Sequence, residues 1–95
     1  MKITFDPRAR DDLDRIFAWI AKDNPKAARD MMARIEARIR LLAVSGSGQM
    51  GRRGLLKGTR ELVEPPYIIV YELRESAGEI VVLAIMHGAQ DRRRT

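Results

Sequence analysis

The chain has 95 residues, a formal net charge of +5 and no cysteine. A chain of this length holds one small domain around a single core, so we expect one domain spanning residues 1–95. The lack of cysteine excludes disulfides and thiolate chemistry, and the absence of a long apolar run predicts a cytoplasmic protein without membrane contact.

The N-terminal segment predicts a short strand followed by a helix. Met1 to Phe5 (MKITF) alternates between apolar and polar residues, as a strand does. Asp6 then offers an N-cap acceptor, and Pro7 suits the first helical position, so a helix should begin here and run to Asp23. Asp12 is expected on its polar side. The apolar stripe of this helix comprises Ala9, Leu13, Ile16, Phe17 and Ile20.

A second helix is expected directly after the first. Asn24-Pro25 repeats the start signal, because the residue before proline is disfavoured in a helix and proline suits a new first turn. The short joint predicts an antiparallel helical hairpin packed on one face of an antiparallel sheet. The buried face of the second helix should consist of Ala28, Met31, Met32, Ile35, Ile39 and Leu42.

The C-terminal third predicts three consecutive strands. Residues 61–64, 67–73 and 79–86 are rich in β-branched and aromatic side chains. The last two are joined by the polar stretch 74–78, and the last strand leads into His87, the chain's one histidine. The predicted fold class is therefore α+β: an N-terminal strand, a two-helix antiparallel hairpin and a three-stranded antiparallel meander, in the order βααβββ.

Basic residues concentrate in two places. Residues 45–60 contain four basic side chains and no acidic one, and three arginines stand next to the C-terminal residue. Such clusters favour an anionic partner, either nucleic acid or an acidic protein segment, although solvated surface arginines explain them equally well. The residues concerned are Arg52, Arg53, Lys57, Arg60, Arg92, Arg93 and Arg94.

An ordered set of short motifs resembles the RelE/ParE superfamily of bacterial type II toxins. The set comprises NP-x-AA at the helix joint, GRRGLLKGTRELV, Y-x-I-x-Y and HG-x-x-D, and it covers nearly the whole chain. The resemblance implies a toxin that is neutralised by a cognate ParD-like antitoxin, which carries a DNA-binding part and an acidic, apolar tail. The toxin would then reach operator DNA only through this antitoxin.

Within the superfamily, the motifs look most like the ParE branch. ParE-like toxins inhibit DNA gyrase by trapping it with cleaved DNA, which requires no catalytic residue, cofactor or metal of the toxin's own. The alternative is a RelE-like ribosome-dependent mRNA endoribonuclease. Ribonuclease branches carry a catalytic arginine just after the first residue of the strand that matches Tyr67 to Tyr71, and here that position is Ile68. If the chain were nevertheless a ribonuclease, its catalytic candidates would be His87, Arg60 and Tyr67.

Several candidates for partner contact also have structural interpretations. Trp19 is expected at the edge of the core or in an interface, Tyr67 and Tyr71 in the core, and His87 in a structural hydrogen bond. The tail 88–95 is expected to be flexible without a partner. A third hypothesis is a nucleic-acid-binding domain that uses the basic residues on phosphates. The partner-binding candidates are Trp19, Arg52, Arg53, Arg60, Glu61, Tyr67, His87, Gln90, Arg92, Arg93 and Arg94.

Overall fold

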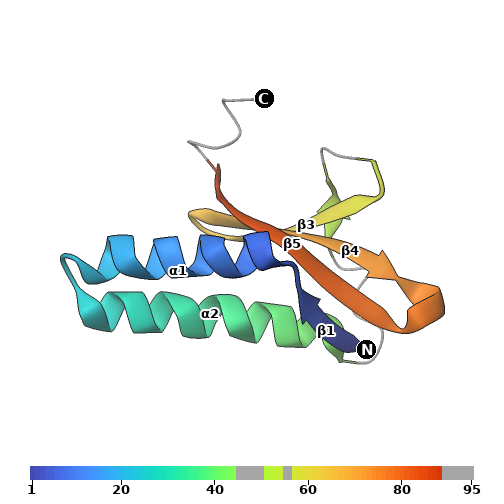
Figure 1. The fold of residues 1–95 in the computed structure, drawn as a ribbon, viewed down its shortest axis with the longest axis horizontal. Coiled ribbons are helices and arrows are strands. Elements are labelled where there is room, and N and C mark those ends of the chain that lie inside the picture. Colours follow the sequence, from blue (N-terminus) through green and yellow to red (C-terminus); the bar gives the residue numbers. More distant parts are fainter. Residues whose placement is uncertain (45–50, 55–56, 89–95) are drawn as a thin grey trace.

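The computed structural model describes residues 1–44, 51–54 and 57–88, and within them the predicted α+β order is confirmed. The two helices lie side by side and antiparallel, as Figure 1 shows. Among the described residues, no helix is long and apolar enough to cross a membrane. The elements are β1 (Lys2–Phe5), α1 (Pro7–Ala21), α2 (Pro25–Ala43), β2 (Arg52–Arg53), β3 (Thr59–Glu64), β4 (Tyr67–Arg74), the short 3-10 helix η2 (Glu75–Ala77) and β5 (Glu79–His87).

The strands of the described residues form one sheet in the order β1-β5-β4-β3-β2. The meander β3–β4–β5 is antiparallel as expected, but the sheet as a whole is mixed, because β1 runs parallel to β5 from Lys2 opposite Glu79 to Phe5 opposite Val82. The antiparallel meander is therefore confirmed, whereas the expectation of an antiparallel sheet fails at β1. Local alternation identifies a strand but carries no information about a partner more than 70 residues away.

Both helices begin where the sequence predicts. The Asp6 carboxylate accepts a hydrogen bond from the backbone N–H of Arg8 at 2.9 Å, and the Asn24 side chain accepts one from the N–H of Ala27 at 3.0 Å. Each cap satisfies a backbone donor that the first turn leaves unpaired. The short joint between the helices therefore turns the chain back on itself, which gives the hairpin.

The hairpin packs on one face of the sheet and forms the main core there. Ile35, Ile39 and Leu42 of α2 are almost completely buried in this core. Tyr67 and Tyr71 also belong to it, as expected. On α1 the apolar stripe is buried or partly buried except at one position, Phe17, whose exposed fraction is 39%. The opposite sheet face carries a smaller apolar cluster of Ile68, Val70 and Ala84, with Leu83 and Met86 against it.

A β-bulge decides which face the end of β5 presents. Val70 pairs with Ala84 and Tyr71 pairs with Val82, so Leu83 is an extra residue without a partner in β4. Strict alternation would place Val82 and Ile85 on opposite faces, yet both belong to the helix-facing core. The bulge therefore turns the residues after Leu83 over, and His87 comes to lie opposite Tyr67 on the helix-facing side.

Asp12 fastens α1 to β5. Its side chain was expected on the polar side of α1, but the residue is only 8% exposed. One carboxylate oxygen accepts a hydrogen bond from the backbone N–H of Ile85 at 2.9 Å, and the other accepts one from Arg15. Strand β1 stops opposite Val82, so Asp12 supplies the acceptor that a longer β1 would have provided to β5. The expectation that Asp12 is exposed was wrong because the helical pattern of apolar residues assigns every carboxylate to the surface and cannot indicate a backbone partner in a distant strand.

Tyr71 holds the short edge strand β2 against the sheet. The backbone N–H of Gly51 donates to the Tyr71 hydroxyl at 3.0 Å, and Arg60 donates to the Gly51 carbonyl at 2.7 Å. A Cβ atom at Gly51 would collide with the Tyr71 hydroxyl and lie 2.9 Å from the Glu61 carbonyl oxygen. Burial raises the pKa of Tyr71, while the Gly51 hydrogen bond and the charge of Arg60 oppose that rise.

We expect Asp12→Ala to lower the free energy of unfolding by about 2 to 3 kcal/mol, because the Ile85 N–H loses a charged acceptor in a buried place. Asp12→Asn should cost less, since the amide oxygen can still accept that bond. Urea denaturation measures both, with Asp14→Ala, on the exposed side of α1, as the matched control. Equal stabilities for the two alanine variants would show that the bond between α1 and β5 contributes nothing.

Replacing Tyr71 with Phe should change the response of stability to alkaline pH. The pKa of Tyr71 is higher in the folded protein than in the unfolded chain, where it is about 10. The protonated phenol therefore contributes its full stabilisation at pH values below about 10, and this contribution is lost as the pH rises through the pKa of the folded protein. Tyr71→Phe should therefore be less stable at neutral pH by about 1 kcal/mol, and its stability should decline less at high pH. Tyr67, whose pKa burial also raises, accounts for part of the remaining decline. Urea midpoints at neutral and alkaline pH test this, and parallel declines in both proteins would contradict it.

Candidate functional site: a groove beside helix α1

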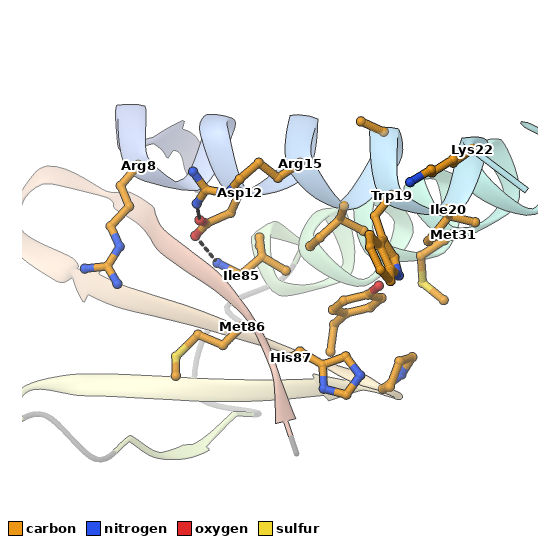
Figure 2. Close-up of a pocket in the computed structure, with 14 residues that line it drawn as sticks. Arg8, Asp12, Arg15, Trp19, Ile20, Lys22, Met31, Ile85, Met86 and His87 are labelled. Carbon is orange, nitrogen blue, oxygen red and sulfur yellow. Dashed lines mark hydrogen bonds and ion pairs between the residues drawn. The ribbon is translucent and has the colours of Figure 1, made fainter. Parts of the chain in front are cut away.

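A groove of about 1270 Å³ runs between α1 and the end of the sheet where β4 begins and β5 ends. Figure 2 shows Trp19 reaching from α1 toward the end of β5, where His87 lies. Apolar side chains such as Ile16, Ile20 and Ile85 also line the groove. The side chains come from segments at opposite ends of the chain, so the groove forms only when α1 docks on β5.

One face of α1 supplies the polar wall of the groove. Its members are spaced by four, three, four and three residues, so they follow one another along the same side of the helix: Arg8, Asp12, Arg15, Trp19 and Lys22. Trp19 is 72% exposed, which contradicts a place at the edge of the core and leaves the other expectation, a place in an interface, as a prediction. Arg8, Arg15 and Lys22 were not among the predicted site residues, although their regular spacing around Trp19 is visible in the sequence.

The groove is positively charged. Three basic side chains of α1 line it, against the single carboxylate of Asp12, which is already engaged with Arg15 and with the Ile85 N–H. Among the residues that the structure describes, no ion pair involves Arg8 or Lys22. Both cations are therefore available to an anionic ligand.

Tyr67 and His87 meet at the strand end of the groove. Their rings pack edge to face, with centroids 5.7 Å apart and an angle of 87° between the planes. Tyr67 is 6% exposed, and its burial raises the pKa of the phenol. The pair thus presents an aromatic wall that faces the same space as Trp19.

Arg60 lies away from this pair. It stands opposite Tyr71 in the sheet, four residues along β4 from Tyr67, a separation of about 13 Å. Its side chain donates to the Gly51 carbonyl. The structure thus brings together two of the three ribonuclease candidates, His87 and Tyr67, and places Arg60 elsewhere.

The other candidates gather around β2. Arg52 forms an ion pair with Glu61 at 3.3 Å, and Glu61 is only 4% exposed, so this pair lies partly inside the protein. Arg53 and Lys57 are exposed at the same edge of the sheet. Gln90, Arg92, Arg93, Arg94 and the tail beyond Gly88 lie outside the described residues. Within the described residues, no three His, Asp or Glu side chains gather closely enough to hold a metal ion.

The face of the sheet opposite the helices has a different character. Ile68 is 5% exposed there and packs in the cluster with Val70 and Ala84. The resemblance described above implies that ribonuclease branches carry a catalytic arginine at this position, where this chain has isoleucine. This part of the sheet is therefore apolar.

Comparison with solved structures gives the same fold. The chromosomal ParDE toxin–antitoxin system from P. aeruginosa matches with a TM-score of 0.77 and 23% identity, covering 92% of this chain and 95% of that one. The isolated E. coli RelE toxin matches with a TM-score of 0.63 and 10% identity, covering 98% and 89%. The intact E. coli RelBE complex matches with a TM-score of 0.59 and 12% identity, covering 88% and 92%.

Comparison of sequences is more specific. The candidate toxin Y4kP of Sinorhizobium fredii (strain NBRC 101917 / NGR234) is 40% identical over 91 residues, covering 94% of this chain and 90% of that protein. The family model described as the ParE toxin of the type II toxin-antitoxin system parDE matches residues 3–92. This chain therefore belongs to the ParE toxin family of type II toxin–antitoxin systems.

Proposed function

We propose that this toxin inhibits DNA gyrase by trapping it with cleaved DNA, and that a ParD-like antitoxin encoded beside it holds it inactive. Gyrase works in the cytoplasm, so the toxin acts there, and it reaches operator DNA only through the antitoxin. This mechanism requires a binding surface on the toxin and does not require a reactive group. Membership of the ParE family supports the proposal.

The observation that carries the proposal is the apolar environment of Ile68. Cleavage of RNA through its 2′-OH needs a base, an acid and a cation that stabilises the phosphorane. Ile68 stands where the ribonuclease branches have their arginine, and it is packed with Val70 and Ala84. A cation is missing from that position, so the arrangement favours a binding inhibitor over a nuclease.

A RelE-like, ribosome-dependent endoribonuclease is the second candidate, because the structure does bring two titratable side chains together. Tyr67 and His87 are in ring contact at the end of the groove. Arg60, the third member of the suggested set, is about 13 Å away along β4. A nuclease would therefore need a cation from another source, such as the ribosome itself.

We expect the purified toxin to stop ATP-dependent supercoiling of relaxed plasmid by gyrase and to increase the amount of cleaved plasmid. An agarose-gel assay measures both products, and adding the antitoxin should reverse the inhibition. Relaxation of the supercoiled form of this plasmid by topoisomerase I is the control, because a toxin that acts on gyrase should leave that reaction unaffected.

An unaffected gyrase, with toxin that is folded and stops cell growth, would overturn the proposal. The second candidate then predicts cleavage of mRNA on translating ribosomes, detected by primer extension. His87→Ala should reduce that cleavage by at least about 100-fold if the imidazole transfers a proton. Neither the wild type nor the His87→Ala variant should cleave free mRNA, since this activity depends on the ribosome.

A further inference from the structure

The groove beside α1 carries basic side chains at equal intervals. Arg8, Arg15 and Lys22 follow one another by seven residues along one side of the helix. Seven residues of a helix rise about 10.5 Å, so the three positions mark a line of about 21 Å. Arg8 and Lys22 form no ion pair within the described residues. Arg15 is paired with Asp12, but its side chain is 72% exposed and its guanidinium has further donors.

A polymer with regularly repeated negative charge fits this line. In a nucleic-acid strand with stacked bases, successive phosphates advance about 3.4 Å, so three steps cover about 10 Å. This length is close to the interval between the basic residues, and the whole line corresponds to about six nucleotides. A peptide carries acidic groups only at particular positions, whereas the phosphates of a strand meet the cations in any register. The spacing therefore favours a phosphate backbone.

The groove also offers aromatic rings to the bases of such a strand. Trp19 stands between Arg15 and Lys22 along α1 and is 72% exposed. Within the described residues, no ring pair involves its indole. Figure 2 shows Trp19 reaching toward the end of β5, where His87 packs against Tyr67. Single strands are bound by aromatic rings along a positively charged groove, because every base has a face that can stack.

These features select a single strand over a duplex. In a duplex the bases are stacked on one another inside the helix, so Trp19 cannot reach a base face and only phosphates are bound. A single strand offers its phosphates and its bases together. This preference agrees with the proposal that the toxin reaches operator DNA, which is a duplex, only through the antitoxin.

We infer that the groove beside α1 binds a single strand of DNA, with phosphates on Arg8 and Lys22 and a base stacked on Trp19. The inference rests on the proposed function in one respect: the proposed target acts on DNA, so the strand is taken to be DNA and not RNA. The groove lies on the helix-bearing side of the sheet, away from the apolar cluster of Ile68 on the opposite face. Strand β2, with its exposed Arg53, is at the far edge of the sheet from β5.

The test titrates the full-length toxin into a fluorescein-labelled oligothymidine of about twelve nucleotides and follows fluorescence anisotropy. Because Trp19 is the chain's one tryptophan, its quenching by the unlabelled strand reports stacking separately. Two variants alter the groove: Trp19→Ala, and Arg8→Ala with Lys22→Ala. The matched control is Lys2→Ala with Arg29→Ala, which makes the same change in net charge at exposed positions outside the groove. Circular dichroism and urea midpoints establish that each variant folds.

The wild type should bind the strand, and its tryptophan fluorescence should fall on binding. Trp19→Ala should bind about tenfold more weakly, because a stacked base is lost. Arg8→Ala with Lys22→Ala should also bind at least about tenfold more weakly. In this variant the slope of log affinity against log salt should shrink by about 1.4, which is about 0.7 for each phosphate contact. The control should stay within about threefold, since distant exposed charges are screened.

A strand that keeps its phosphates but lacks its bases separates the two kinds of contact. Trp19→Ala should bind this abasic strand as tightly as the wild type does, because no base is present to stack. Arg8→Ala with Lys22→Ala should still bind it more weakly. A purely structural effect of the Trp19 substitution would weaken both strands alike and would contradict the stacking contact.

Wild-type affinity in both groove variants would overturn the inference, because the strand would then bind at another surface. An equally tight complex with a duplex of the same length would also overturn it, since phosphates alone would explain the binding. An oligouridine that binds at least about tenfold more tightly than the oligothymidine would overturn the assignment to DNA. If no strand binds and only the antitoxin changes the tryptophan fluorescence, the groove is a protein site and the inference is wrong.

The binding measurements contain no gyrase, so the two proposals fail separately. A toxin that binds no strand but stops supercoiling leaves the proposed function standing without the groove's assigned ligand. A toxin that binds the strand through the groove but leaves gyrase unaffected keeps the site and removes the proposed target.

Discussion

The hydrogen bond from the Ile85 N–H to the Asp12 carboxylate fixes the relation between the helical hairpin and the sheet. Strand β1 reaches only as far as Val82 and leaves the rest of the β5 edge without a strand neighbour in the described residues. Helix α1 takes the place of the missing strand, and a buried carboxylate supplies the missing acceptor. The short β1 and the carboxylate in the middle of α1 therefore act together to satisfy the backbone of β5.

This attachment also creates the groove. Asp12 is bonded to β5, and the residues that follow it at spacings of three and four lie on the same side of α1. These residues therefore project beside the end of that strand. Trp19 and Lys22 therefore stand near His87, while the stripe one step around the helix, including Leu13 and Ile16, packs into or beside the core. The same helix therefore has one face that packs in the core and another that is exposed and charged.

The two faces of the sheet are both apolar, and their polar exceptions lie at the ends and edges of the strands. The helix-facing side is filled by the main core, and the other side carries a small apolar cluster around Ile68. The titratable side chains that do lie near each other, Tyr67 and His87, are at the strand end, where they form an aromatic wall. Arg60 is committed to the Gly51 carbonyl and so helps to hold β2 in place.

Local signals in the sequence were sufficient for the two helices and for β1, β3, β4 and β5, but not for the two-residue strand β2 or the short helix η2. Asp6-Pro7 and Asn24-Pro25 predict both helix starts because capping depends on a few neighbouring residues, and the β-branched runs predict β3, β4 and β5. The motifs from the helix joint to His87 likewise indicated the family that the comparisons show. These features could be read directly, because each depends on residues close together in the chain.

Only the tertiary structure decided the pairing of β1 with β5, the burial of Asp12 and the exposure of Trp19. Each depends on segments far apart in the chain, and helical periodicity alone does not distinguish a carboxylate with a buried partner from one in water. The bulge at Leu83 is the clearest case: one unpaired residue reverses the alternation of β5 and turns His87 toward Tyr67. The sequence by itself determined the helices, the longer strands and the family, and long-range packing decided which side chains meet at the groove.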